Sequence, residues 1–506
     1  MLPLLISTAF GLEFSPCHPK GLGMQANCAT LSVVVKTEKI EIPLIHIPAV
    51  KNTNRPPIFV LAGGPGQAAT EIGPMVFQKM QILHTHHDLL FLDQRGTGKS
   101  GLSCSDDSQL DSLQTDDTKS NNSLEQFSAT IEQQLEELQV CVENLDFDVS
   151  DYSTANAAKD IEEVRKEMGF QSIALYGISY GTGLAQTYAY NFPEHVAGLI
   201  LDGVVDIHQP MGEYVEEDAT ITWHAFLERC DKDLRCSTLN PQQSFHDIWE
   251  KLPQKITIRH PRTYKKQSIT IQRDGFLSLL RMLLYSTETM ELLPLALKQA
   301  SEDDWGHLIT LSTQGGDMGV SMALNLSIFC SESLPFWKLE EQVNLSEKLI
   351  YNPVQNPFSD QVRPMMKKMC EVWPNYDFQP LAVRSSKSDV PVLLFHGELD
   401  PITPSSRSRS LLEQYSQVHE VIVPNKGHNV ALTDCGTNMM IDFLQKYNGE
   451  PSVEIIDCHQ ERPLRFFHTV AGHLSEENTE IDQKEVKKIE EGKKKSMETT
   501  EEKRTP

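Results

Sequence analysis

The sequence has few of the features that mark membrane, metal-binding or nucleic-acid-binding proteins. No stretch of its 506 residues reaches 18 consecutive apolar residues, so no membrane-spanning helix is expected. No C-x-x-C pair and no cysteine–histidine cluster with zinc spacing occurs, and we expect no metal and no cofactor. Positive charge is scarce, because 45 Lys and Arg stand against 70 Asp and Glu. The resulting net charge of -25 argues against nucleic acid as a partner.

The composition is that of a globular protein with a large core and a second module. Hydrophobic residues make up 39% of the chain and charged residues 23%. The length exceeds that of a single small domain. Residues 474–506 are almost entirely Glu, Lys, Ser and Thr, which predicts a disordered charged tail, with a short solvated helix as the alternative.

Short apolar segments alternate with helical patterns along most of the chain. This alternation predicts an α/β domain with a mostly parallel sheet. A helix is predicted over 154–169 with Ser153 as its N-cap, and another over 182–190. The predicted strands are 31–35, 40–47 (joined to the first by a turn at 37–39), 57–61, 88–92, 172–176, 196–201, 392–395 and 418–423.

The strand series is interrupted between residues 206 and 389. Helical periodicity dominates there, as in 274–284 and 290–300, so we predict an inserted, mainly helical cap. The predicted boundaries are 17–205 and 390–473 for the two parts of the core, 206–389 for the cap and 474–506 for the tail.

The sequence LYGISYGTGLAQ contains a G-x-S-x-G motif centred on Ser179. A buried strand precedes the motif and a helix follows it, which is the context of a sharp turn that exposes a nucleophilic serine. Gly177 and Gly181 would let strand and helix pack closely. A strand–helix turn without chemistry is the alternative reading.

An acid and a histidine follow two later strands. Asp400 comes directly after the strand at 392–395, and His428 comes after the strand at 418–423. A nucleophilic serine needs a base, and the base needs an orienting acid. We therefore predict Ser179, His428 and Asp400 as nucleophile, base and acid.

Two backbone amides are candidates for stabilising an oxyanion. One belongs to Tyr180, the residue after the serine. The other is predicted at Gly64, in the sequence GGPG that follows the strand at 57–61, although a plain tight turn would explain the same glycines.

The tripeptide Gly98-Lys99-Ser100 resembles the end of a phosphate-binding P-loop. That motif requires a glycine where this chain has Asp93, so we reject a nucleotide site. Arg95, in the same turn, is interpreted as a structural ion-pairing residue.

Six sequences, in this order, together resemble a known family: LAGGPGQ, FLDQRGTGKS, LYGISYGT, LILDGV, PVLLFHGELDPITP and GHNV. They are similar to the serine aminopeptidases related to proline iminopeptidase, and more closely to the tripeptidyl-aminopeptidase-like branch, from about Cys17 to Cys458. The resemblance implies the α/β-hydrolase fold and a peptide substrate with a free N-terminus. It does not fix how many residues are released. One departure is Ala62, where proline iminopeptidases usually have histidine.

Other activities stay open beside the aminopeptidase reading. Several members of the superfamily are carboxylesterases, and a hydrolase-like binding protein without catalysis is a third reading. The family holds the substrate ammonium group with acidic side chains near the cap. Glu332 is the first candidate, and Glu213, Glu216 and Glu217 form a second cluster, although each could be a solvated surface carboxylate.

The ten cysteines fall into local neighbours, with ten free thiols as the alternative. The family resemblance implies five disulfides at these neighbours and therefore an extracytoplasmic, periplasmic or secreted protein. The apolar segment at residues 2–12 would then be the remnant of a signal peptide, although it lacks a basic region. The oligomeric state is left open. The implied pairs are Cys17–Cys28, Cys104–Cys141, Cys230–Cys236, Cys330–Cys370 and Cys435–Cys458.

Overall fold

The computed structural model describes most of the chain between residue 12 and residue 467. The predicted tail at 474–506 and the apolar segment at 2–11 lie outside the described residues. The described residues are 12–35, 38–51, 54–102, 130–259, 265–314, 319–338, 357–358, 362–383, 385–447, 458 and 463–467.

The described residues form one nine-stranded sheet in the order β1-β2-β3-β5-β4-β6-β7-β10-β11. Strands β1, β2 and β3 run antiparallel to their neighbours, and β5, β4, β6, β7, β10 and β11 pair in parallel. The strands are β1 (Ser15–Cys17), β2 (Ala26–Val35), β3 (Glu38–Ile47), β4 (Ile58–Leu61), β5 (Leu89–Leu92), β6 (Ile173–Ile178), β7 (Val196–Asp202), β10 (Val392–Gly397) and β11 (Val418–Val423).

Every predicted strand corresponds to a strand of this sheet, but some ends differ. The predicted turn at 37–39 is wrong in part, because β3 already begins at Glu38 and pairs Glu38 with Val35. Strand β10 continues to Gly397, two residues beyond the predicted end. His396 is completely buried in this strand. Because histidine is polar, the apolar pattern in the sequence ends before it and the predicted strand ends too early.

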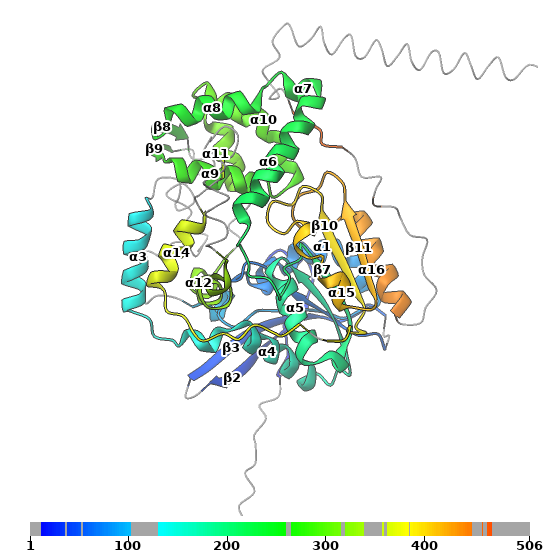
Figure 1. Ribbon diagram of the computed structural model, residues 1–506. Coiled ribbons are helices and arrows are strands. Elements are labelled where there is room, and N and C mark those ends of the chain that lie inside the picture. The colour runs from blue at the N-terminus through cyan, green and yellow to red at the C-terminus, as the bar shows by residue number, and fades with distance from the viewer. Residues whose placement is uncertain are drawn as a thin grey trace, which may run out of the picture.

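Helices cover both faces of the sheet (Figure 1). The predicted N-cap of α4 is confirmed, because Ser153 Oγ accepts a hydrogen bond from Asn156 N at 3.2 Å. Helix α4 ends two residues earlier than predicted, and α5 is longer than predicted at both ends. The helices of the core are α1 (Ala69–His84), α3 (Ile131–Glu143), α4 (Thr154–Glu167), α5 (Tyr180–Asn191), α15 (Leu411–Gln414) and α16 (Asp434–Tyr447).

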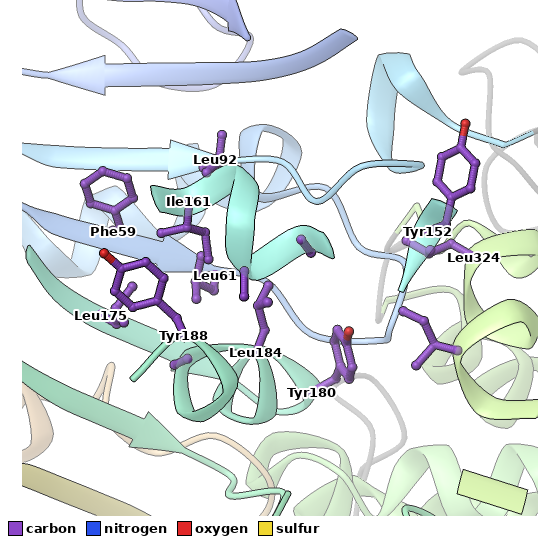
Figure 2. Packing of buried hydrophobic residues seen from close by; sticks show 14 of the residues in the cluster. Phe59, Leu61, Leu92, Tyr152, Ile161, Leu175, Tyr180, Leu184, Tyr188 and Leu324 are labelled. Atoms are coloured by element: carbon purple, nitrogen blue, oxygen red, sulfur yellow. The ribbon is translucent and has the colours of Figure 1, made fainter. Parts of the chain in front are cut away.

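The two faces of the sheet bury different side chains of the same strands. In β4, Phe59 and Leu61 pack with α4 and α5, whereas Ile58 and Val60 pack with α1 and α16. Figure 2 shows the first cluster, to which Phe59 of β4 and Tyr188 of α5 both belong. Burying each large apolar side chain stabilises the fold by about 1.5–3 kcal/mol, so this alternation fixes the register of the strands.

Most residues between β7 and β10, the interval of the predicted cap, form helices, and those from α6 to α11 lie at the top of Figure 1. Helices α6 to α11 share a hydrophobic core that includes Trp223, Phe226, Phe245 and Phe276, whereas α12 and Cys370 of α14 pack on the core of the sheet. The cap also contains an antiparallel hairpin that the sequence reading missed, β8 (Gln254–Arg259) with β9 (Lys266–Ile271). The helices of this interval are α6 (Val215–Lys232), α7 (Leu234–Ser237), α8 (Pro241–Lys251), α9 (Arg273–Leu283), α10 (Thr287–Ser301), α11 (Gly306–Gln314), α12 (Met322–Ile328) and α14 (Val362–Val372).

Residues 463–467 pack on the cap, although they follow the last core helix in sequence. Leu464 and Phe466 belong to the cap cluster, and the rings of Phe466 and Phe226 are 5.9 Å apart. The backbone of Arg465 donates to Glu291 Oε1 at 2.8 Å, and that of Phe467 donates to Glu291 O at 3.1 Å. The chain therefore returns from the core to the cap near its C-terminal end.

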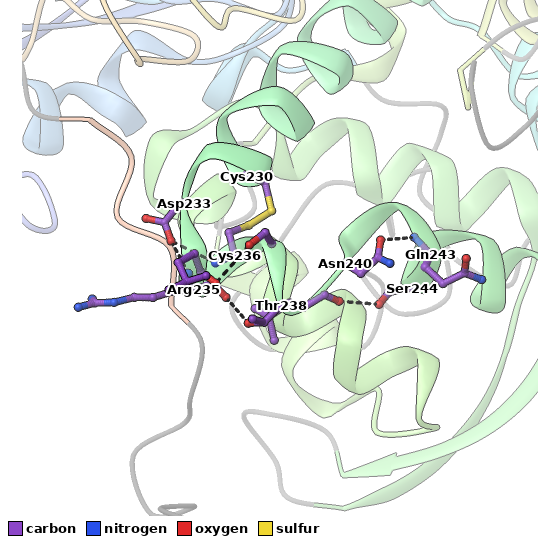
Figure 3. Close-up of a disulfide and its surroundings, with 11 residues drawn as sticks. Cys230, Asp233, Arg235, Cys236, Thr238, Asn240, Gln243 and Ser244 are labelled. Atoms are coloured by element: carbon purple, nitrogen blue, oxygen red, sulfur yellow. Dashed lines mark hydrogen bonds between the residues drawn. A yellow bond between two sulfur atoms is a disulfide. The ribbon is translucent and has the colours of Figure 1, made fainter. Parts of the chain in front are cut away.

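Four of the implied disulfides are present: Cys17–Cys28, Cys230–Cys236, Cys330–Cys370 and Cys435–Cys458. Figure 3 shows the pair that closes the end of α6, where the Asp233 side chain accepts hydrogen bonds from Arg235 N and Cys236 N and so caps α7. The implied partner of Cys141 is Cys104, which lies outside the described residues. Within the described parts of the chain, no helix is long and apolar enough to cross a membrane.

Candidate active site

Ser179 lies at a sharp turn between β6 and α5. Its φ of 54° and ψ of -122° are unusual for a residue with a side chain. A methyl group on Gly177 would lie 2.5 Å from Gly181 O, and one on Gly181 would lie 2.3 Å from Leu61 O. At Gly183, two residues further on, a methyl group would lie 3.7 Å from its nearest neighbour, Val205 Cγ1, which is an ordinary contact distance. The turn therefore requires glycine at both positions of the motif, as the sequence predicts, while the partly exposed serine projects from it.

The glycine-rich turn after β4 contacts the serine. A methyl group on Gly63 would lie 3.0 Å from Ser179 Cβ and 3.1 Å from Ile178 O. Gly64, the predicted oxyanion donor, is the next residue and has a φ of 108°. The structure thus brings the GGPG turn against Ser179 and shows that Gly63, which the sequence reading did not single out, makes the closest approach.

Helix α12 and the residue before it bind this turn. Ser321 N donates to Gly66 O at 2.9 Å, and Asn325 Nδ2 donates to Pro65 O at 3.0 Å. Asn325 belongs to α12, and Ser321 is the N-cap of that helix. The conformation of the turn therefore depends on α12, a helix of the interval between β7 and β10 that packs on the core of the sheet.

Asp400 and His428 form a buried pair at the ends of the neighbouring parallel strands β10 and β11. His428 Nδ1 lies 2.7 Å from Asp400 Oδ2, and the side chains are 5% and 0% exposed. Asp400 Oδ1 accepts hydrogen bonds from Ile402 N at 2.8 Å and Thr403 N at 2.9 Å. Thr403 Oγ1 donates to Asp400 Oδ2 at 2.8 Å. These donors fix the carboxylate so that it faces Nδ1 of the ring and leaves Nε2 for another partner.

Asp400 and His428 each shift the pKa of the other toward the charged form. Burial raises the pKa of Asp400, but the His428 charge and hydrogen bond, with the Thr403 and Ile402 amides, bring it down to about 2. Burial lowers the pKa of His428, but the Asp400 carboxylate reverses this and raises it above the usual value. The pair therefore favours an ionised acid that orients the imidazole.

The serine and the histidine lie on adjoining segments of the sheet edge. Ser179 N donates to Asp202 O at 2.8 Å, and the next residue, Gly203, lies against the imidazole of His428. A methyl group on Gly203 would come within 2.6 Å of His428 Cε1. The fold thus places Ser179, Asp400 and His428 at the carboxyl ends of parallel strands of one sheet, and the segment 202–203 contacts both Ser179 and His428.

The cap also holds the loop that carries the histidine. His428 N donates to the carbonyl of Tyr285, which follows α9, at 2.7 Å. Arg229 of α6 donates to Asn425 Oδ1 at 2.9 Å and pairs with Glu398 at 2.8 Å. The loops that carry His428 and Asp400 are therefore both tied to α6 of the cap.

Glu332, the first candidate for binding an ammonium group, lies in the short π-helix η5 (Phe329–Ser333). Its Oε1 accepts from Thr154 N at 2.8 Å and from Tyr376 Oη at 2.5 Å, and its Oε2 accepts from Thr154 Oγ1 at 2.6 Å. Thr154 Oγ1 is in turn 2.6 Å from the hydroxyl of Tyr180. Two hydrogen bonds through the Thr154 hydroxyl therefore connect Glu332 to the side-chain hydroxyl of Tyr180, the residue that follows Ser179.

The other acidic candidates have partners within the cap. Glu216 is 2% exposed and pairs with Arg363 at 2.8 Å, while also accepting from Val362 N. Glu217 pairs with the same arginine at 3.2 Å. Glu213 accepts a hydrogen bond from Lys338 N at 2.8 Å. These contacts join α6 to the segments around Lys338 and Arg363 and favour a structural role.

Arg95 has the structural role that the sequence indicates. It is 3% exposed, and its guanidinium donates to both carboxylate oxygens of Asp160 in α4, at 2.7 Å and 2.5 Å. A third hydrogen bond reaches Asp151 O at 2.7 Å. The arginine thus ties the turn after β5 to α4.

Two family profiles match the chain. Residues 56–235 match the α/β hydrolase fold, and residues 353–452 match a profile described as TAP-like protein. With the sheet and the serine turn described above, the chain is an α/β hydrolase, and it is a serine hydrolase by class. Its C-terminal part is of the TAP-like type, and this part carries Asp400 and His428.

The chain is similar in sequence to proteins whose names differ. YuaR of Escherichia coli (strain K12) is 23% identical over 80% of this chain and 79% of YuaR. A tripeptidyl aminopeptidase of Streptomyces lividans is 21% identical over 70% of this chain and 67% of that protein. Carboxylesterase B of Mycobacterium tuberculosis (strain CDC 1551 / Oshkosh) is 31% identical over 36% of each chain.

Proposed function

We propose that the protein is a serine aminopeptidase that acts on peptides with a free N-terminus, with Ser179, His428 and Asp400 as its triad. Ser179 Oγ attacks the scissile carbonyl while His428 Nε2 takes its proton and later gives it to the leaving amine. The amides of Tyr180 and Gly64 stabilise the oxyanion. Water then hydrolyses the acyl-enzyme and releases the N-terminal fragment.

The position of Glu332 is the observation that carries the choice of substrate. Its described hydrogen-bond donors, Thr154 and Tyr376, are neutral. Burial raises the pKa of the Glu332 carboxyl, and these hydrogen bonds only partly offset it. A substrate ammonium group would supply the counter-charge that favours the ionised carboxylate. Glu332 is linked through the Thr154 hydroxyl to the side-chain hydroxyl of Tyr180, the residue after Ser179, which connects the proposed ammonium site to the serine turn.

Replacing Glu332 by glutamine tests this assignment. We expect kcat/KM for peptides with a free α-amine to fall by roughly 30- to 5000-fold, since losing a buried charge partner costs about 2–5 kcal/mol. Hydrolysis of N-acetylated peptides should change little, because they bring no ammonium group. The measurement is kcat/KM for matched free and acetylated peptides with wild-type and variant protein.

Glu213→Gln provides the matched control. This carboxylate lies in the same cap and its described side-chain contact is with a backbone amide, an interaction that glutamine can keep. The variant should treat free and acetylated peptides as the wild type does. Loss of amine discrimination in Glu213→Gln instead of Glu332→Gln would transfer the role to that residue.

An esterase is the second candidate function. The similarity to carboxylesterase B supports it. If wild-type protein hydrolyses acetylated peptides or simple esters as fast as free-amine peptides, the esterase function is correct and Glu332 has no recognition role.

We also propose that the protein works outside the cytoplasm. The four disulfides support this location, since such bonds do not persist in a reducing compartment. Mass spectrometry of protein from its own cells, alkylated without reduction, tests it. Free thiols at all ten cysteines would contradict the location.

A further inference from the structure

The aspartate of the LILDGV sequence has a place in the site that the proposed triad does not use. Asp202 is the last residue of β7 and is 0% exposed. A buried carboxylate is costly unless it is hydrogen-bonded or paired. Its contacts therefore show what this part of the sheet edge is built to hold.

Asp202 contacts the segments of both proposed reacting residues. Its Oδ1 accepts from Val430 N at 2.7 Å, and its Oδ2 accepts from Ala431 N at 3.1 Å. These two amides belong to the backbone just after His428. The carbonyl of Asp202 accepts from Ser179 N at 2.8 Å. One residue thus fixes the backbone on both sides of the proposed proton transfer.

The carboxylate of Asp202 also acts on the charge of His428. Burial raises the pKa of Asp202 to about 6, although the Val430 and Ala431 amides and the His428 charge work against this. The negative charge of Asp202 adds to that of Asp400 in raising the pKa of His428. The titratable group that faces Asp202, besides His428, is Tyr176. His428 is faced by Asp400, Asp202 and Tyr285. Asp400 is in turn faced by His396 and Asp218.

We propose that Asp202 is a positioning residue of the hydrolase, which fixes the loop behind His428 and supplies a second negative charge to the imidazole. The proposal rests on the proposed roles of Ser179 and His428. It separates two tasks: Asp400 orients the ring through Nδ1, whereas Asp202 sets the position of the loop and adds to the stabilisation of the imidazolium.

Removing the charge of Asp202 should change the pH dependence of the reaction. His428 must be neutral to accept the serine proton, so the rate falls as the pH drops through the pKa of His428. Asp202 adds this stabilisation only in its ionised form, which the His428 charge and the Val430 and Ala431 amides favour. Without its charge the imidazolium is less stable, so the pKa of His428 and the midpoint of the profile move to lower pH.

The experiment compares the rate of labelling of Ser179 by a fluorophosphonate probe across pH in wild type and Asp202→Asn. We expect the acid-side midpoint to fall by about 0.5–1 on the pH scale. The matched control is Asp93→Asn. Asp93 directly follows β5, is 2% exposed and accepts from Thr70 N at 2.7 Å. Its replacement should lower the melting temperature without moving the midpoint.

A second variant decides the question if Asp202→Asn does not fold. Tyr176 Oη donates to Asp202 Oδ2 at 3.1 Å, and Tyr176→Phe removes this donor, raises the pKa of Asp202 and lowers the midpoint by less. A midpoint that stays at the Asp93→Asn value in Asp202→Asn, or in Tyr176→Phe where Asp202→Asn does not fold, would overturn the role of Asp202 alone. A wild-type protein that is not labelled at Ser179 would overturn the proposed triad and this role together.

Discussion

Replacing Ser179 by alanine is expected to reduce kcat by a factor on the order of 10⁶, because a catalytic triad acts as a unit. The substitution removes one oxygen and leaves the turn, with its two tightly packed glycines, unchanged. Thermal unfolding should therefore be close to that of the wild type. The measurement is single-turnover hydrolysis of a free-amine peptide together with fluorophosphonate labelling.

A second serine–histidine contact in the protein provides the control. Ser408 Oγ lies 3.2 Å from His396 Nε2, and both residues are buried. Ser408→Ala should keep most of the activity and all of the labelling. If folded Ser179→Ala retains substantial turnover, Ser179 is not the nucleophile and the proposed mechanism fails.

Replacing Asp400 by asparagine should lower kcat by roughly 10⁴ while the protein still folds. In the wild-type protein the Asp400 carboxylate accepts the Nδ1 proton of His428 at 2.7 Å. An asparagine that turns its amide group to the ring would favour the tautomer with the proton on Nε2, and this tautomer cannot take a proton from serine. Steady-state kinetics at neutral pH measures the loss.

Asp218→Asn separates this effect from a general change of charge near the site. Asp218 pairs with Arg407 at 2.7 Å and is electrostatically coupled to Asp400. It lies on α6 of the cap. We expect its replacement to change kcat by less than about tenfold. Activity near the wild-type level in Asp400→Asn would move the orienting acid to another residue.

The sequence predicts the parts of the site that depend on local patterns. Ser179 is recognisable because the strand, the tight turn and the helix are adjacent in the chain. Asp400 and His428 are recognisable because each follows a predicted strand. Parallel strands then bring their carboxyl ends to one edge, so the sequence predicts that these residues meet.

The sequence could not predict contacts that depend on how the cap folds back. Glu332 is 178 residues from Thr154, and no local pattern relates the two. The same holds for Asp202, which bonds to amides 228 and 229 residues later in the chain. Glu213 and Glu216 resemble a free acidic cluster in sequence, because Lys338 and Arg363 are more than a hundred residues away.

The way the cap grips the core has a consequence for engineering. Asn325 holds the glycine-rich turn, the carbonyl of Tyr285 holds His428, and Arg229 holds both loops that follow β10 and β11. Caps are often regarded as exchangeable modules that set specificity while the core supplies the chemistry. In this protein a transplanted cap would also have to reproduce these anchoring points, so specificity and rate cannot be varied independently by domain exchange.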